Sequence, residues 1–347
     1  MPLTTRLPAL VLAAVAALAG CKRGRDPAPS SGQPSAPPPG QADTTARDSL
    51  QAKVQARLDS LPAQSSFYAR DIRTGRTVAV RADQPMNTVS VIKLAVMVQA
   101  YRDADAGRLK LDERHLIRPE EMRQGSGVLR MFAPGLQPTY RDLITQMIAT
   151  SDNTASDILI ARVGRDRVNH LLDSLQYRET RLRMTLGELF RGVWVQLDSA
   201  NVRMTDRQVF DRGFPDDSAA PERFFRYVTD STHWLGRTTA REIGLFLEQL
   251  ELGRLASETA TDEMRGALLN QVWDTRLPQR IGERVPVGHK TGDWEPQIGN
   301  DVGIVFAPSG PIVMAAFTNA NTGPMWQLNA ALGRVAEDVL NAWTAAR

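Results

Sequence analysis

The chain has 347 residues, of which 42% are apolar and 23% are charged, and its formal net charge is +3. This composition is typical of one large or two modest globular domains and excludes general disorder. The small net charge and the absence of a long Lys/Arg run exclude a nucleic-acid-binding protein with a basic face. One cysteine excludes a disulfide framework and a cysteine-ligated metal, and the four histidines lack metal-site spacing, so we expect no cofactor and no metal.

The first 21 residues are typical of a bacterial lipoprotein signal peptide. Arg6 precedes an apolar run at 7–20, too short to span a membrane comfortably, which ends in Leu-Ala-Gly-Cys. We therefore expect Cys21 to carry a lipid anchor, with an ordinary secretory signal as the alternative. This prediction places the protein in the cell envelope, lipid-anchored and facing the periplasm, and Lys22 favours the outer membrane.

The signal peptide is followed by a predicted linker and then by the first helices and strands of the folded part. Residues 22–45 are rich in Pro, Ser and Gly without apolar periodicity, which predicts a disordered linker. Ser49 is the expected cap of an amphipathic helix that ends at Pro62. Alternating and apolar patterns then predict two strands, at 66–72 and 76–81. The next segment, at 91–106, is apolar on nearly every side in its first turns, which predicts a helix buried on all sides.

The middle of the chain is helical, and strands return near its end. Helices are predicted at 139–150, with a Thr139/Asp142 capping box, and at 154–163, 238–252 and 261–273. Three antiparallel strands and a final helix are predicted at 285–290, 301–306, 311–318 and 326–343. These positions predict one sheet built from both ends of the chain, with an inserted helical lobe and a ligand cleft between them.

Three short motifs follow one another: Ser-Val-Ile-Lys at 90–93, Ser-Asp-Asn at 151–153 and Lys-Thr-Gly at 290–292. In the first motif Ser90 and Lys93 are three residues apart on a helix, so both side chains share one face. Burial and a nearby cation lower the pKa of a lysine, so its amine can act as a base toward the serine hydroxyl. The motif therefore predicts a nucleophile and its base.

The second motif offers a proton relay and an anchor. Ser151 is a candidate to pass a proton to a leaving nitrogen, and Asn153 is a candidate to hold Lys93 and a substrate amide. Each motif alone also has a structural reading, because Ser-Asp-Asn is a good helix cap and Lys-Thr-Gly is a plausible turn. Their common order, and their use of two of only five lysines, favour chemistry.

The third motif provides charge and backbone donors at a strand edge. Lys290 is a candidate fixed positive charge, Thr291 a candidate carboxylate-binding hydroxyl, and Gly292 completes this substrate-binding segment. The backbone N–H groups of Asp293 and Ser90 are the expected oxyanion hole, in which one donor contributes about 3 kcal/mol to the transition state.

These motifs resemble those of the class A β-lactamase-like serine hydrolases, a branch of the penicillin-recognising enzymes. The resemblance covers about residues 47–347 and is carried also by the stretches 81–113, 124–129 and 140–164. It implies an α/β fold, an α+β sandwich with a five-stranded antiparallel sheet flanked by the terminal helices. It places a catalytic domain at 46–347, with a sheet lobe at 46–112 and 280–347 and an all-α lobe at 113–279. It also implies an acyl-enzyme at Ser90 without a cofactor.

The chain departs from the pattern of this family at the residues for deacylation and carboxylate binding. Members that hydrolyse β-lactams well place a glutamate after the Ser-Asp-Asn helix, where it activates water. When the sequence is aligned with the family pattern on Thr-Arg-Leu at 180–182, the position of that glutamate holds Leu186. Glu188, two residues later, is the candidate base, and the alternative is that Glu188 is an exposed carboxylate without a catalytic role. Asn300 and Asp301 stand where active members often present an arginine.

The segment between Ser151 and Lys290 is longer than the family pattern, and the surplus lies at about 190–236. It could form a satellite hydrophobic cluster under a surface excursion, or a lid that reshapes the substrate pocket. Its aromatic residues include Trp194, Phe210, Phe214, Phe224, Phe225, Tyr227 and Trp234.

Three functions are compatible with this sequence. The first is β-lactam hydrolysis, linked to antibiotic resistance, by a membrane-tethered monomer. The second is a D,D-carboxypeptidase or related peptidase acting on peptidoglycan peptides through the same serine, which the expanded segment and the missing arginine favour. The third is an inactive penicillin-binding lipoprotein, and the intact motifs argue against it.

Overall fold

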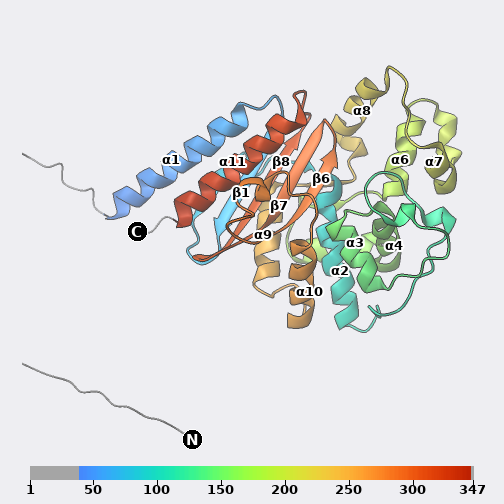
Figure 1. Ribbon diagram of the computed structural model, residues 1–347, viewed down its shortest axis with the longest axis horizontal. Coiled ribbons are helices and arrows are strands. Elements are labelled where there is room, and N and C mark those ends of the chain that lie inside the picture. The colour runs from blue at the N-terminus through green and yellow to red at the C-terminus, as the bar shows by residue number, and fades with distance from the viewer. Residues whose placement is uncertain (1–38, 345–347) are drawn as a thin grey trace, which may run out of the picture. The chain divides into compact units, whose positions relative to one another are not determined.

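The computed structural model describes residues 39–344 (Figure 1). The predicted signal peptide at 1–21, with Cys21, and residues 22–38 of the predicted linker lie outside the described residues. The compact unit that begins at Asp43 contains a five-stranded sheet in the order β2-β1-β8-β7-β6, and every neighbouring pair is antiparallel. The strands are β1 (Gln64–Asp71), β2 (Thr77–Val80), β6 (Val287–Trp294), β7 (Ile298–Ala307) and β8 (Gly310–Asn319). The predicted sheet from both chain ends is confirmed.

Both faces of this sheet are buried. Successive side chains of a strand point to opposite faces, so a strand covered on both sides needs apolar residues at every position. Along β8 alternate side chains join two separate cores, Ile312, Met314 and Ala316 in one and Val313, Ala315 and Phe317 in the other. The first core also contains residues of α1 (Pro39–Asp59) and α11 (Met325–Thr344), which run side by side along one face (Figure 1).

The opposite face of the sheet carries α9 (Ala240–Glu251), which packs on β1, β7 and β8, and α10 (Glu258–Leu269), which packs on β6. The helical lobe contains α2 (Lys93–Asp105), α3 (Tyr140–Ala149), α4 (Asn153–Val163) and α5 (Arg165–Ser174). Two helices, α2 and α9, pack with the other lobe than the boundaries expected from sequence assign to them. The helix α2 is apolar on nearly every side and packs among α3, α4, α5 and α10, whereas the amphipathic α9 lays its apolar side on the sheet.

The expanded segment folds into short helices. It contains the end of α6 (Leu186–Val195), then η4 (Ser199–Arg203), α7 (Asp206–Arg212), α8 (Ala220–Thr229) and η5 (Ser231–His233). A second small sheet, β3-β5-β4, joins Met86–Asn87, Gly236–Thr238 and Arg181–Leu182. None of the helices within residues 39–344 has both the length and the apolar character that a membrane crossing requires.

Most expected helix ends agree with the structure, and those of two helices do not. The Thr139/Asp142 capping box at the start of α3 is confirmed. The first helix begins at Pro39 rather than after Ser49, so the prediction of a disordered linker is wrong for residues 39–45, which are helical. The helix α10 starts after Ser257, whose side chain accepts from the N–H of Ala260, and ends at Leu269, four residues before the expected end.

Candidate active site

Ser90 lies in a short 3-10 helix, η1 (Val89–Ile92), that leads directly into α2. The residue before it, Val89, has a φ of +39°, which is a strained conformation for a β-branched residue. The side chain of Asn87 holds this turn by accepting a hydrogen bond from the N–H of Val89 at 3.0 Å. Asn300 on β7 in turn donates to the carbonyl of Asn87 at 2.9 Å. The strained turn thus holds the Ser90 side chain at the wall of a cavity.

Lys93 is completely buried one helical turn after Ser90. Its amine nitrogen donates to the backbone carbonyl of Ser151 at 2.7 Å, to the hydroxyl of Ser151 at 3.2 Å and to Oδ1 of Asn153 at 2.8 Å. Burial, and then the positive charge of Lys290, lower the pKa of Lys93 well below its ordinary value. The structure therefore joins the first two motifs around an amine whose environment disfavours its charged form.

The Ser-Asp-Asn segment is fixed by the loop at 124–129. The φ of Ser151 is +56°, and Asp152 caps α4 by accepting from the N–H of Ala155 at 2.9 Å. The amide of Asn153 donates to the carbonyl of Gln124 at 2.9 Å, and the hydroxyl of Ser126 donates to the carbonyl of Ser151 at 2.8 Å. These contacts hold the Ser151 and Asn153 side chains toward Lys93.

The Lys-Thr-Gly motif lies inside β6, not at its end, because β6 continues to Trp294. Lys290 is completely buried, and burial lowers its pKa to about 7 although Asp293 and Asp301 oppose the shift. The hydroxyl of Thr291 is buried and has no hydrogen-bond partner among the described residues. A Cβ on Gly292 would meet the carbonyl oxygen of Thr88, so only glycine lets β6 approach η1 this closely.

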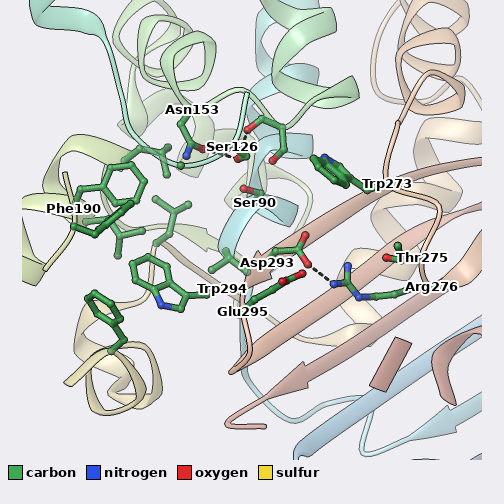
Figure 2. Close-up of a pocket in the computed structure, with 18 of the residues that line it drawn as sticks. Ser90, Ser126, Asn153, Phe190, Trp273, Thr275, Arg276, Asp293, Trp294 and Glu295 are labelled. Carbon is green, nitrogen blue, oxygen red and sulfur yellow. Dashed lines mark hydrogen bonds and ion pairs between the residues drawn. The ribbon is translucent and has the colours of Figure 1, made fainter. Parts of the chain in front are cut away.

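The first two motifs and Asp293, the residue after the third motif, border one cavity of about 610 Å³, whereas Lys290, Thr291 and Gly292 are buried and do not line it. Ser90, Ser151, Asn153 and Asp293 all line it, and Figure 2 shows Ser90 between the loop that carries Ser126 and the strand that carries Asp293. The structure therefore brings together the residues that sequence analysis selected from three distant segments. No group of three or more potential metal-ligating side chains occurs in the part of the chain that the structure describes.

Glu188, the predicted deacylation base, does not line this cavity. Its carboxylate accepts from the N–H of Thr185 at 2.7 Å in a capping box at the start of α6, and it pairs with Arg165 at 3.3 Å. The side chain is 47% exposed. Leu186, one residue into the helix, lines the cavity instead. The assignment of Glu188 as the deacylation base is therefore corrected, because the carboxylate caps its own helix on the surface.

Arg276 is a residue of the cavity that sequence analysis missed. It is 1% exposed, forms an ion pair with Asp293, and donates to the carbonyl of Asn300 at 3.3 Å. Asn300 and Asp301 on β7 stand where an arginine was expected, and Arg276 brings a positive charge to this place from the loop between α10 and β6. Asn300 and Asp301 themselves have structural partners, since they accept from the backbone N–H groups of Thr318 and Leu277. No motif marks Arg276, so only the fold reveals it.

Comparisons with known proteins agree with this site. The β-lactamase enzyme family matches residues 49–343. A β-lactamase of Streptomyces lavendulae is 28% identical over 265 residues, which are 74% of this chain and 74% of that protein. The crystal structure of a β-lactamase from Sphaerobacter thermophilus is 26% identical with a TM-score of 0.68, and the match covers 86% of this chain and 97% of that one.

The fold is also similar to that of PBP-A, for which a mutant was solved as an acyl-enzyme complex with penicillin G. That structure is 21% identical with a TM-score of 0.67, over 86% of this chain and 97% of that one. With the matched span and the motif cluster around Ser90, we conclude that this chain is a serine hydrolase that belongs to the β-lactamase enzyme family.

Proposed function

We propose that this protein opens β-lactams by forming an acyl-enzyme at Ser90. The observation that carries the proposal is the buried Lys93 amine, held by Ser151 and Asn153 one helical turn from Ser90. Its lowered pKa favours the uncharged amine, which is the form that acts as a base. The Ser90 hydroxyl loses its proton to this amine while its oxygen bonds to the lactam carbonyl carbon. The lactam C–N bond then breaks, and its nitrogen receives a proton through the Ser151 hydroxyl.

The strand β6 supplies the remaining groups of the proposed site. The backbone N–H groups of Ser90 and Asp293 stabilise the negative charge that develops on the carbonyl oxygen. The substrate carboxylate binds near Arg276, the cation that lines the cavity, and toward the Thr291 hydroxyl, which has no hydrogen-bond partner among the described residues. Gly292 lets β6 approach the turn that carries Ser90.

We infer that the ester at Ser90 is long-lived. Leu186 lines the cavity at the position where efficient β-lactamases of this family carry a glutamate, and Glu188 is turned to the surface. Water near the ester therefore lacks the expected carboxylate base. The same leucine favours the second candidate function, a D,D-carboxypeptidase acting on peptidoglycan peptides through Ser90.

A chromogenic cephalosporin tests the proposed function with the full chain. We expect a stoichiometric burst of ring opening, followed by slow turnover, and neither phase in Ser90→Ala. If the cephalosporin stays intact while the wild-type protein releases D-alanine from a cell-wall peptide, the peptidase replaces this proposal. If both substrates stay intact, the inactive lipoprotein replaces it.

We also propose a lipid anchor at Cys21, which would hold a monomer at the periplasmic side of a membrane, preferably the outer one. The support is the signal sequence at 1–21 followed by the Pro/Ser-rich segment at 22–45. Metabolic labelling with a radioactive fatty acid tests this, because Cys21→Ser removes the acceptor thiol and with it the label.

A further inference from the structure

Four aromatic side chains form one end of the cavity, and we call them the aromatic wall: Phe190, Phe214, Phe224 and Trp294. Their ring centroids are 5.2 to 6.4 Å apart in the contacts Phe190–Phe214, Phe214–Phe224 and Phe224–Trp294. The planes of these three pairs meet at 72° to 89°, which is the favourable edge-to-face arrangement. Phe214 and Phe224 belong to the expanded segment, which therefore shapes the cavity.

The aromatic wall is anchored to neighbouring elements. The hydroxyl of Tyr227 on α8 donates to the carbonyl of Leu189 on α6 at 2.8 Å. A Cβ on Gly192 would collide with this hydroxyl, so the glycine permits the approach of α8 to α6. The indole N–H of Trp194 donates to the carbonyl of Gly213 at 3.1 Å, next to Phe214. Because these contacts fix the rings in advance, a ligand loses less ordering entropy when it binds them.

The expanded segment is also tied to the catalytic residues. The side chain of Gln124 donates to the carbonyl of Phe210, and the carbonyl of Gln124 accepts from Asn153 at 2.9 Å. At the other end of the segment, the amide of Asn87 donates to the carbonyl of Val228 at 3.3 Å. Asn87 also holds the turn before Ser90. The expanded segment, which carries Phe214 and Phe224, is thus held at two points by residues that also position the nucleophile and its base.

The two ends of the cavity differ in chemistry. Figure 2 shows Phe190 and Trp294 on one side of Ser90, and Thr275 and Arg276 on the other. Around the aromatic wall the cavity is lined by three leucines, Leu186, Leu189 and Leu235, and its charged lining residues are Arg276, Asp293 and Glu295. In a β-lactam, the acylamino substituent and the ring carboxylate lie on opposite sides of the scissile bond. A carboxylate near Arg276 therefore directs the acyl side chain toward the aromatic wall.

We propose that the aromatic wall binds an aromatic ring in the acyl side chain of the substrate, so that this enzyme prefers penicillins with arylacetyl side chains. This inference rests on the proposed function and adds the substrate class. The ring meets the faces and edges of four fixed rings and is removed from water, whereas a charged or absent side chain gains neither contact. Phe214 and Phe224 are thus specificity residues supplied by the expanded segment.

Two penicillins that share one nucleus test this inference. Benzylpenicillin carries a phenylacetyl group, and 6-aminopenicillanic acid carries a free amine in its place. The second-order rate constant of Ser90 acylation is measured for each by intact mass. We expect Phe224→Ala to lower the constant for benzylpenicillin about tenfold and that for 6-aminopenicillanic acid by less than about twofold. The unchanged reaction with 6-aminopenicillanic acid reports that the variant is folded.

Phe225→Ala is the matched control, because Phe225 is the next residue on α8, is half-buried, and does not line the cavity. It should leave both rate constants unchanged. An equal fall for both penicillins in Phe224→Ala, or no change for either, overturns the aromatic wall as a specificity site. Failure of both penicillins to acylate the wild-type protein refutes the proposed function and this inference with it, whereas equal acylation refutes the inference alone.

Discussion

The backbone N–H of Leu186 donates to Oδ1 of the buried Asp157 at 2.7 Å, which fixes the first residue of α6 at the cavity wall. The N–H of Gly187 donates to the second carboxylate oxygen at 2.8 Å, so the first two N–H donors of the helix are satisfied by one side chain. Arg123 pairs with the same carboxylate at 2.6 Å. A side chain at position 186 is therefore held beside the place where an ester at Ser90 would form.

This position predicts a gain of turnover in Leu186→Glu. A carboxylate there would act as a general base toward water, which typically contributes a hundredfold or more, so we expect deacylation to become about a hundredfold faster. The decay of the penicillin adduct, followed by intact mass, measures this rate. Leu186→Gln is the control of equal length without a base, and it should deacylate as slowly as wild type. Equal acceleration in both variants would show that a base is not what the site lacks.

Glu188→Ala should affect stability rather than catalysis. The carboxylate caps α6 through Thr185, and losing a cap interaction typically costs about 1 kcal/mol, so we expect that loss in the free energy of unfolding. Urea denaturation measures it. Deacylation should be unchanged, since the side chain faces solvent and pairs with Arg165. A large fall in deacylation would restore Glu188 as the base.

Lys93→Met should remove acylation while leaving the protein folded. Loss of the base is expected to lower the acylation rate constant by about a hundredfold to ten-thousandfold. Methionine fills nearly the same space, and Ser126 already donates to the Ser151 carbonyl, so the free energy of unfolding should change by less than about 2 kcal/mol. Lys110→Met, at an exposed lysine, is the control and should alter neither quantity. Normal acylation in Lys93→Met would exclude Lys93 as the base.

The two buried lysines predict a bell-shaped pH profile for acylation by a carboxylate-bearing β-lactam. Lys93 must be uncharged to act, and its pKa is lowered, so the rate should fall only when the pH drops below that lowered pKa. Lys290 must be charged to attract the carboxylate, and its pKa is about 7, so binding should weaken as the pH rises through about 7. Steady-state kcat/KM measured across the pH range in which the protein stays folded tests both limbs.

Lys290→Arg separates the two limbs. A guanidinium stays protonated throughout this range, so the alkaline limb should disappear while the acid limb remains. A profile that keeps its alkaline limb in this variant would assign that limb to another group.

The sheet and the motif residues could be predicted from sequence because their signals are local. Strands buried on both faces appear as apolar runs, and the capping box at Thr139 marks a helix start wherever the helix packs. The scarcity of lysine pointed to Lys93 and Lys290, which the structure buries completely. Glu188 was misassigned although a local signal was present, since Thr185 three residues earlier completes the same capping pattern.

Other features depend on packing between distant segments. Arg276 belongs to no motif and reaches the cavity only because its loop follows α10 across β6 and β7. The aromatic residues of the expanded segment were visible in the sequence as a cluster. Phe214 and Phe224 face the cavity, whereas Phe225 does not. This difference depends on how α8 packs against α6, which residue spacing alone does not determine.

The site of covalent attachment is the most direct test of an acyl-enzyme at Ser90. Full-length protein is incubated with benzylpenicillin, and the intact mass and the modified peptide are followed over time. We expect a persistent gain of one penicillin mass, located on Ser90, and no adduct in Ser90→Ala. An unmodified wild-type protein, or an adduct of equal yield in Ser90→Ala, would contradict this expectation.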